Sequence, residues 1–335
     1  MQILRTPEPF SPAFGEILYA VSLTEDEKGE EISIFNSAVT EKIGIKKATE
    51  VPTFNLNVSD YVRSQIRIEP FARRECGIME AIQRTFYSCI AHQEWASTNP
   101  HTAGIVSMGM NKPLCEPVIR RISEDEQDEI CWIATDGPVS ARALFPLHDK
   151  DPIEIYLGRE EIVDPKMLAL IINGPNLNNL LQQRGYAWSD FSQFAVEVYA
   201  SHRLMSRIEY RIRPYNSNKI RLAWWNRQGA IDMYSFEAVK EVHYKVEKEQ
   251  VAANEMTRQY SGTGRKEMSV VTGCSTRQQD QWLAQIIGAP QVWMEQKEKW
   301  MPVQILNTTF PLYHPEKTEI EIRFAESVST PFQSL

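Results

Sequence analysis

Apolar residues recur at every second position in most segments of this chain, and this alternation restricts the folds that it can adopt. Successive side chains of a β-strand point to opposite faces of a sheet, whereas one face of a helix repeats every three or four residues. The clearest case is TEIEIRF, in which Ile320, Ile322 and Phe324 share one face and charged residues share the other. The pattern predicts antiparallel sheets with one buried face.

The same pattern predicts further strands along the chain and a hairpin near its end. The segment QVWMEQKEKWMPVQIL has two strand-like halves around a polar tip at residues 296–299, and we expect it to pair with TEIEIRF. The other predicted strands are residues 17–23, 31–35, 194–200, 206–212 and 238–246. The predicted fold class is therefore mainly β, with β-sandwich-like antiparallel sheets, a few short helices and several domains.

The best helix candidate is STRQQDQWLAQIIG, residues 275–288. Ser275 can cap its first turn and Gln278 completes a capping box, while Gly288 ends the helix before a proline. A second helix, with sparser apolar positions, is predicted for residues 77–85. The apolar face of the first helix consists of Trp282, Leu283, Ile286 and Ile287.

The composition is that of a folded chain without basic character. Of its 335 residues, 42% are hydrophobic and 24% are charged, which excludes global disorder. A net charge of -8 gives no general reason to expect a nucleic-acid partner. The longest apolar run, residues 167–172, is too short for a membrane span, and no secretory signal is recognised at the start. We expect synthesis in the cytoplasm.

Turn-forming and charged segments divide the chain into three predicted parts. These are an N-terminal β-rich part at residues 1–172, a middle antiparallel β domain at residues 186–255, and a C-terminal helix-and-hairpin module at residues 267–335 that could pack with the middle domain. We expect a linker at residues 173–185 and a flexible connection at residues 253–266, which contains SGTG. The acidic run SEDEQDE, residues 123–129, predicts a solvated loop or a hairpin tip.

No pattern of catalytic or metal-ligating residues stands out. The five cysteines lack C-x-x-C spacing and the six histidines lie far apart, so we expect no catalytic residue, metal or cofactor, and we expect reduced, buried thiols. The segment LIINGPNLNNLL, residues 170–181, is similar to the N-terminal signature of type II dehydroquinases. That family has a doubly wound parallel sheet, and the segments after Gly185 do not alternate between strand and helix, so we reject this assignment.

The segment LAWWNRQGAIDMYSF, residues 222–236, predicts a hairpin with aromatic side chains on both faces. The adjacent Trp224 and Trp225 point to opposite faces, and the NRQG turn joins the two strands. We expect at least one tryptophan in the core and the other at an interface. A sugar-stacking site that uses Trp224 or Trp225 with nearby tyrosines such as Tyr234 is the alternative, although two adjacent rings cannot form one continuous surface.

The C-terminal third contains a series of motifs in a defined order. A W-x-N-x-x-G-x-x-D-x-Y-x-F element precedes a long charged strand, a segment with Arg258 and Tyr260, a helix, a V-W-x-E hairpin and a last strand that ends in FAES. The element is filled by Trp224, Asn226, Gly229, Asp232, Tyr234 and Phe236. This order, with a weaker match in PFSPAFGEILYAVSL, resembles the tail-associated structural proteins of phages and prophages of gut Bacteroidetes.

The resemblance implies a non-enzymatic virion component of the phage tail or baseplate. Such a protein would assemble in the bacterial cytoplasm as a symmetric homo-oligomeric ring, with other virion proteins as partners, and then reside in the virion. Its motif residues are packing signatures and carry no chemistry. Two alternatives stay open: a carbohydrate- or receptor-binding β-sandwich with a host-surface glycan as ligand, and a β-rich glycan hydrolase. The hydrolase would need two carboxylates about 5 to 9 Å apart in a cleft.

Overall fold

The computed structural model of the chain describes most of its C-terminal two thirds and separate segments of its N-terminal part. Between residues 113 and 309 the gaps are residues 117, 135–136, 164–165, 227–229, 254–255 and 273–275, and residues 320–327 and 330–331 follow. The described N-terminal segments are residues 2–5, 10–12, 18–22, 31–36, 41–47, 53–57, 70, 74–80 and 86–88.

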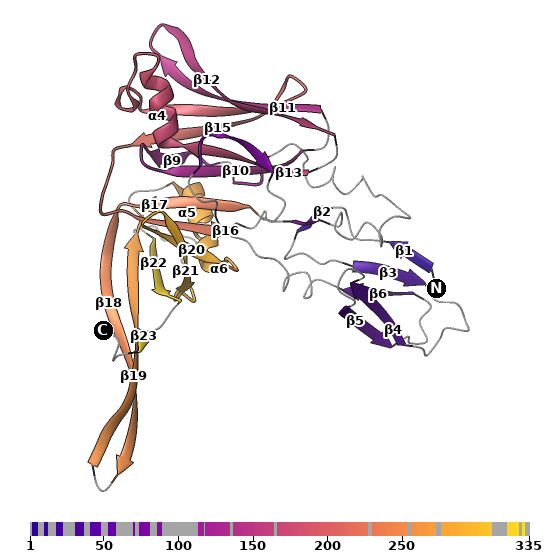
Figure 1. Cartoon of the computed structure of the whole chain (residues 1–335), viewed down its shortest axis with the longest axis vertical. Helices are drawn as coiled ribbons and strands as arrows, with labels where there is room; N and C mark the ends of the chain where they lie inside the picture. Colours follow the sequence, from indigo (N-terminus) through magenta and orange to yellow (C-terminus); the bar gives the residue numbers. More distant parts are fainter. Residues whose placement is uncertain are drawn as a thin grey trace.

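This part of the chain is mainly β, with several antiparallel sheets, which confirms the fold class predicted from the alternation (Figure 1). The first sheet has five strands in the order β12 (Lys150–Ile162), β11 (Gly137–Leu147), β14 (Gln193–Ala200), β15 (Arg203–Arg213) and β9 (Arg120–Ser123). Its pairs are antiparallel except that of β15 with β9, which is parallel. No doubly wound parallel sheet is found in the described residues, in agreement with the rejected dehydroquinase assignment.

The inner face of the first sheet is held by aromatic packing. The ring of Phe194 stacks between Phe145 and Tyr210, with centroid distances of 4.8 Å on both sides. A 3-10 turn, η3 (Trp188–Asp190), adds Trp188 to this cluster with an edge contact of 6.2 Å to Phe145. Aromatic side chains dominate core energetics, so this stack fixes β11, β14 and β15 as one layer.

A second sheet of three strands, β10 (Gln127–Ala134), β13 (Lys166–Asn173) and β7 (Gly77–Glu80), lies between two cores. Trp132 and Leu170 belong to the core of the first sheet, while Cys131 and Ala169 share a smaller cluster with Ala230, which directly precedes the strand at residues 231–236. Strands covered on both faces are near-continuously apolar, as ICWIA and MLALII are.

The helix predicted for residues 77–85 is wrong over residues 77–80, which form β7, and residues 81–85 lie outside the described part. Strand β7 pairs with Leu168–Ile171 of β13, so its backbone hydrogen bonds go to a partner that lies almost a hundred residues later in the sequence. Tertiary pairing overrides the weak local helical pattern.

The segment expected to be a linker, residues 173–185, contains the helix α4 (Gly174–Gln182). Asn173 caps it by accepting a hydrogen bond from the Asn176 N–H at 2.9 Å. Leu177 and Leu181 are fully buried in the core of the first sheet, which includes strands on both sides of α4 in the sequence. A Cβ at Gly174 would lie 2.7 Å from the Ser123 carbonyl oxygen, so only glycine fits this close approach.

The third sheet has eight strands and contains the motif hairpin. Its order is β17 (Ile231–Phe236), β16 (Ile220–Trp225), β20 (Val292–Gln296), β21 (Lys299–Ile305), β22 (Glu321–Glu326), β19 (Met256–Val271) and β18 (Ala238–Ala253), and β23 (Thr330–Pro331) also pairs with β19. The predicted hairpin is β20–β21, and its predicted pairing with TEIEIRF is the β21–β22 pair. Both predictions are confirmed.

The predicted C-terminal helix is present as α5 (Arg277–Leu283) and α6 (Gln285–Gly288). Its cap is Thr276, whose hydroxyl accepts a hydrogen bond from the Gln279 N–H at 3.2 Å, and Ser275 lies outside the described residues. Trp282, Leu283 and Ile286 pack into the core of the third sheet, as the apolar face predicted. No described helix has the length and apolarity that a bilayer crossing requires.

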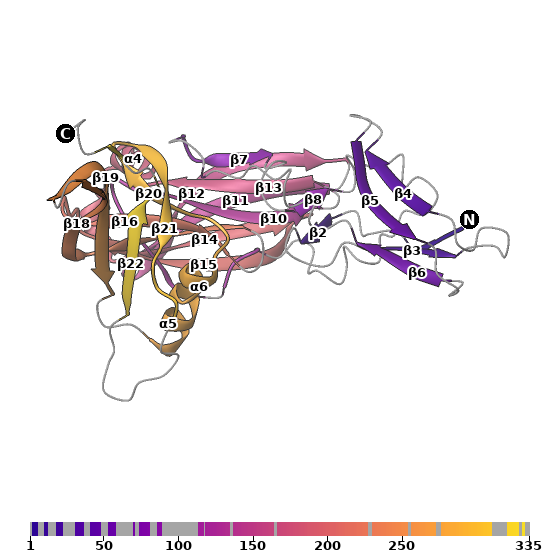
Figure 2. The ribbon, with the colours of Figure 1, turned by 90° about the horizontal axis from the view of Figure 1, so that it is seen from below.

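The N-terminal strands form small sheets at one end of the molecule, beside the ends of the larger sheets (Figure 2). One contains β1 (Gln2–Arg5), β3 (Leu18–Ser22) and β6 (Thr53–Asn57). The others pair β4 (Glu31–Asn36) with β5 (Glu41–Lys47), and β2 (Phe10–Pro12) with β8 (Phe86–Ser88).

Candidate functional site

The motif element forms the predicted hairpin, with Trp224 opposite Asp232 and Trp225 opposite Ile231. Leu222 and Trp224 point into the core covered by the helix α5, whereas Trp225 packs with Trp293 on the other face of the sheet. The predicted distribution of the two tryptophans over opposite faces is therefore what the structure shows.

The proposed stacking residues are all buried. The exposed fraction is 0% for Trp224, 6% for Trp225 and 3% for Tyr234, so none offers a free ring face to a sugar. Trp224 contacts Trp282 at a centroid distance of 5.2 Å, and the Tyr234 hydroxyl accepts a hydrogen bond from Arg121 at 3.1 Å. Phe236 is also fully buried. This burial favours the packing role over the glycan-binding alternative.

The polar residues of the element meet at Asp232, which is fully buried. Its carboxylate accepts hydrogen bonds from the Trp282 Nε1 at 2.8 Å and the Asn226 Nδ2 at 2.9 Å, and it forms an ion pair with Arg120. Asn226 also closes the turn by accepting a hydrogen bond from the Ala230 N–H at 3.0 Å. Gly229 lies outside the described residues. The element is thus a motif for internal hydrogen bonding.

Arg120 connects this element to the second sheet. Its guanidinium donates to both carboxylate oxygens of Asp128, at 2.8 and 3.0 Å, and Asp128 also accepts a hydrogen bond from the Tyr210 hydroxyl at 2.9 Å. Burial lowers the pKa of Arg120, but Asp128 and Asp232 outweigh it, so this pKa lies well above its ordinary value. We call this group the ion network; it consists of Arg120, Asp128, Tyr210, Asn226, Asp232 and Trp282.

Only the turn at residues 124–125 of the acidic run fits the predicted solvated loop or hairpin tip, and most of the rest of the run is buried. Glu126, Asp128 and Glu129 are all at most 4% exposed, and β10 begins within the run. Two of these charges are compensated by cations from other elements, because Arg120 of β9 pairs with Asp128 and Lys219, in the loop before β16, approaches Glu126 at 2.9 Å. Buried charges persist only when they are paired in this way.

Glu126 illustrates how strong this compensation is. Burial raises its pKa, but Arg221 and Lys219 and a hydrogen bond from Ser235 outweigh that effect and lower the pKa to about 2. The Ser123 N–H donates a further hydrogen bond to its carboxylate at 2.9 Å. Glu126 therefore stays ionised inside the protein.

The ion network has no arrangement suited to catalysis. Asp128 and Asp232 share one arginine and are buried, so they do not face a cleft, as the carboxylates of a glycan hydrolase must. Cys115 lies beside the network, and burial raises the pKa of its thiol to about 11, which keeps it protonated and weakly nucleophilic. Among the described residues no group of three His, Cys, Asp or Glu side chains could hold a metal ion.

The second prominent feature is the long hairpin of β18 and β19, which projects from the body of the molecule (Figure 1). Each strand has 16 residues, and the pairing runs from Ala238–Val271 to Ala253–Met256. The flexible connection predicted at residues 253–266 is therefore wrong, because this segment, apart from residues 254–255, belongs to paired strands. The SGTG sequence pairs with β18 across the hairpin.

Support from the body reaches only part of the hairpin. Among the described strands, β22 pairs with residues 267–271 of β19 and β23 pairs with residues 263–264. On one hairpin face Val242 is 53% exposed and Tyr244 is 43% exposed. A Cβ at Gly264 would lie 2.3 Å from the Tyr244 ring, so this ring covers the glycine. The other face carries Glu241, His243, Lys245 and Glu247.

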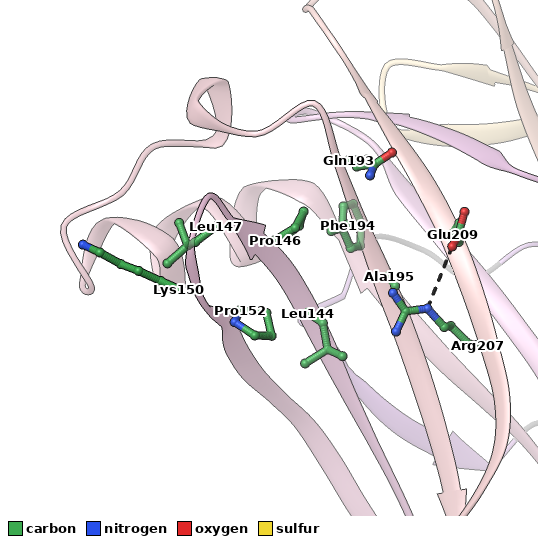
Figure 3. A pocket seen from close by; sticks show the side chains of 10 residues that line it. All are labelled: Leu144, Pro146, Leu147, Lys150, Pro152, Gln193, Phe194, Ala195, Arg207 and Glu209. Carbon is green, nitrogen blue, oxygen red and sulfur yellow. Dashed lines mark ion pairs between the residues drawn. The ribbon is translucent and has the colours of Figure 1, made fainter.

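The outer face of the first sheet carries paired charges and a shallow hollow. Arg142 bridges Glu154 and Glu197, both at 2.9 Å, and Arg207 approaches Glu197 at 2.9 Å. A hollow of about 240 Å³ lies at the end of this face (Figure 3). Figure 3 shows the Arg207–Glu209 ion pair on one side of it and apolar or proline side chains on the other. No group of reactive side chains meets there.

Sequence reasoning identified Asn226 and Asp232 as structural residues but missed their partners. Arg120 and Asp128 lie eight residues apart on different strands, and Asp232 lies 112 residues after Arg120. No spacing rule connects such positions. Comparison with known proteins adds no assignment, because no protein-family model matches the chain and no curated protein matches it. The functional inference depends on the geometry described above.

Proposed function

We propose that this protein is a non-enzymatic structural component of a phage or prophage virion, in the tail or the baseplate. The observation that supports the proposal most directly is the hairpin β18–β19, which projects from the body of the molecule and carries the exposed apolar residues Val242 and Tyr244 near its base. The order of the C-terminal motifs, which resembles that of phage tail proteins, is the reason for proposing a virion as the assembly.

A two-stranded ribbon is marginally stable in water by itself, because it has no second layer to pack against. In the described part of the chain the outer half of the hairpin has only such pairing, apart from the short contact with β23. Exposed strand edges and the Val242–Tyr244 face are surfaces on which another chain can pack or pair. The hairpin therefore has the properties of an assembly arm.

The position of the hairpin also fits a ring of identical subunits. An arm that binds the body of the next copy makes a head-to-tail contact, and such contacts close into a ring when the rotation between copies allows it. Copies of the same chain and neighbouring virion proteins are therefore the partners that we propose, with assembly in the bacterial cytoplasm.

The direct test is to locate the protein in particles released by the strain that encodes it. We expect mass spectrometry of density-purified particles to detect the chain, and immunogold electron microscopy to label one end of the tail. Absence of the chain from purified particles that contain the other tail proteins would refute the proposal.

A shortened hairpin tests whether this feature is the arm. Lys248 lies opposite Gly262, so residues 249–261 can be replaced by Asn-Gly, which favours the tight turn of a two-residue hairpin. We expect this variant to fold but to be absent from particles. The matched control is Lys245→Gln, on the charged face, which should be incorporated normally. Equal incorporation of the shortened variant would show that the hairpin is not the arm.

A glycan-binding role is the second candidate, and no observation favours it, because the rings proposed for stacking are buried. The hydrolase alternative lacks support for a similar reason. The buried carboxylates of Asp128 and Asp232 both bind Arg120 inside the protein, where a glycan cannot reach them.

A further inference from the structure

A polar cavity of about 350 Å³ lies where β9, the end of β15 and β17 meet. The charged residues that line it are Arg121 of β9, Glu126 of the turn after β9, Arg213 of β15, Lys219 of the loop after β15, and Glu237 directly after β17. This volume is enough for a small molecule together with a few waters, and ligand sites commonly combine such a cavity with a few convergent polar groups.

Arg121 is the cation in this cavity that has no carboxylate partner. Its guanidinium donates to the Tyr234 hydroxyl at 3.1 Å and to the Gln279 side-chain oxygen at 3.3 Å, and both acceptors are neutral. No described Asp or Glu oxygen lies within ion-pair distance of it. A half-buried guanidinium with neutral partners keeps a strong attraction for an anion.

Arg213 faces the same space from β15. It forms an ion pair with Glu237, whose side chain is 54% exposed, at the rim of the cavity. Its pKa is lowered first by burial and then by the positive charge of Arg121. Arg121 and Arg213 lie on the paired strands β9 and β15 and line the same cavity, so their like charges repel each other.

The remaining charges of the cavity are already matched. Glu126 faces Lys219 and Arg221, and Lys219 also contacts the Asp125 carboxylate at 2.7 Å. The Glu126 and Asp125 carboxylates are thus paired with other cations, and neither forms an ion pair with Arg121. One positive charge at Arg121 is left facing the cavity, in a chain with a net charge of -8.

We propose that this cavity binds a small oxyanion, a carboxylate or a phosphate group, between Arg121 and Arg213. Planar guanidiniums donate pairs of hydrogen bonds in the geometry that carboxylate and phosphate oxygens accept. A bound oxyanion would supply the negative charge that Arg121 lacks and would relieve its repulsion with Arg213. The acidic character of the whole chain disfavours long polyanions, so the ligand is a small molecule.

The test is isothermal titration calorimetry on the full-length protein with two probes, inorganic phosphate and succinate. We expect saturable binding with one site per chain for at least one probe, and comparison of the two decides between phosphate and carboxylate chemistry. If neither probe gave a heat of binding at concentrations up to about 10 mM, the dissociation constant would be too large for a specific site. This result would overturn the proposal.

Variants then assign the binding to the cavity. Arg121→Gln should weaken binding by about tenfold or more, and Arg121→Lys should weaken it less, because it keeps the charge and loses the paired hydrogen bonds. The matched control is Arg159→Gln, at an exposed arginine that pairs with Glu161 and lies outside the cavity. Unchanged binding in Arg121→Gln would place the anion elsewhere and refute the site.

Arg213→Gln provides a second, independent variant if Arg121→Gln unfolds, which circular dichroism detects. Arg213 does not share the hydrogen bonds to Tyr234 and Gln279, so its loss leaves the contact of β9 with β17 and α5 in place. We expect weaker binding again. This proposal does not depend on the virion role, since neither outcome in the titration changes whether the chain is present in particles.

Discussion

The ion network and the projecting hairpin are both built from charged residues on β-strands, yet they lie in opposite surroundings. Asp128 and Asp232 are 4% and 0% exposed and every charge has a partner from another element. On β18, His243 and Lys245 are exposed and approach Glu241 and Glu247, which lie two residues away on the same strand, and Lys240 pairs with Glu321 of β22. The two regions show that charge in a strand does not determine its exposure.

The comparison also separates two energetic roles. A buried pair contributes little net stability when formed but costs a great deal when one partner is removed, because the remaining charge is left in a low dielectric. An exposed pair contributes about 0 to 1 kcal/mol and is screened by salt. We therefore expect large effects of substitution in the network and small ones in the hairpin, where the consequence is on assembly.

The largest effect is expected for Asp232→Ala. This change leaves Arg120 with one carboxylate and removes the acceptor of Trp282 and Asn226, so the free energy of unfolding should fall by about 5 kcal/mol. Denaturant unfolding followed by circular dichroism measures it. Glu161→Ala, at an exposed pair with Arg159, is the control and should change stability by less than about 0.5 kcal/mol. Equal effects at the two sites would contradict the contrast.

Trp224→Ala should lower the free energy of unfolding by about 4 kcal/mol, because it empties a fully buried site between β16 and α5. The control is Tyr156→Ala, at a tyrosine that is 60% exposed. Thermal or denaturant unfolding distinguishes the two roles of Trp224. A ligand-stacking tryptophan would leave the stability unchanged.

Glu126 makes the stability of this region depend on acid. Its pKa in the folded protein is about 2, below 4.5, so its contribution is fully present above about pH 4.5 and is lost as the pH falls toward 2. The loss amounts to about 3 kcal/mol. Unfolding free energies measured between pH 6 and pH 2.5 should fall less steeply for Glu126→Gln than for the native chain. If the profiles of Glu126→Gln and the native chain ran parallel, the cationic neighbours of Glu126 would not be what keeps its carboxylate ionised.

The smallest effect on folding is expected in the hairpin. Val242→Ser changes a side chain that is 53% exposed, and the free energy of unfolding should change by less than about 0.5 kcal/mol. Incorporation into particles should nevertheless fall, because the apolar face of the arm is altered. A variant that is destabilised by more than 1 kcal/mol, or one that is incorporated normally, would place Val242 in the fold of the monomer instead of its assembly surface.

Local pattern was sufficient for several elements. Alternation identified the strand that contains Ile322 and Phe324, its pairing with β21, and the opposite faces of Trp224 and Trp225. The spacing of Trp282, Leu283 and Ile286 identified the helix over the third sheet. These features depend on residues that are close in sequence, so the period of the apolar positions carries enough information to find them.

What the sequence determined by itself was the class of the fold and, in the strands and the helix with a clear apolar period, the residues that face the core. The tertiary structure decided which charges are buried: most of the acidic run at residues 123–129 became part of the protein interior because Arg120 of β9, Lys219 in the loop before β16 and Arg221 of β16 approach it. It also turned residues 77–80 and most of residues 253–266 into paired strands. The burial of a charge and the pairing of a strand depend on partners in other elements, most of them far away in the sequence, and no local pattern encodes the partner.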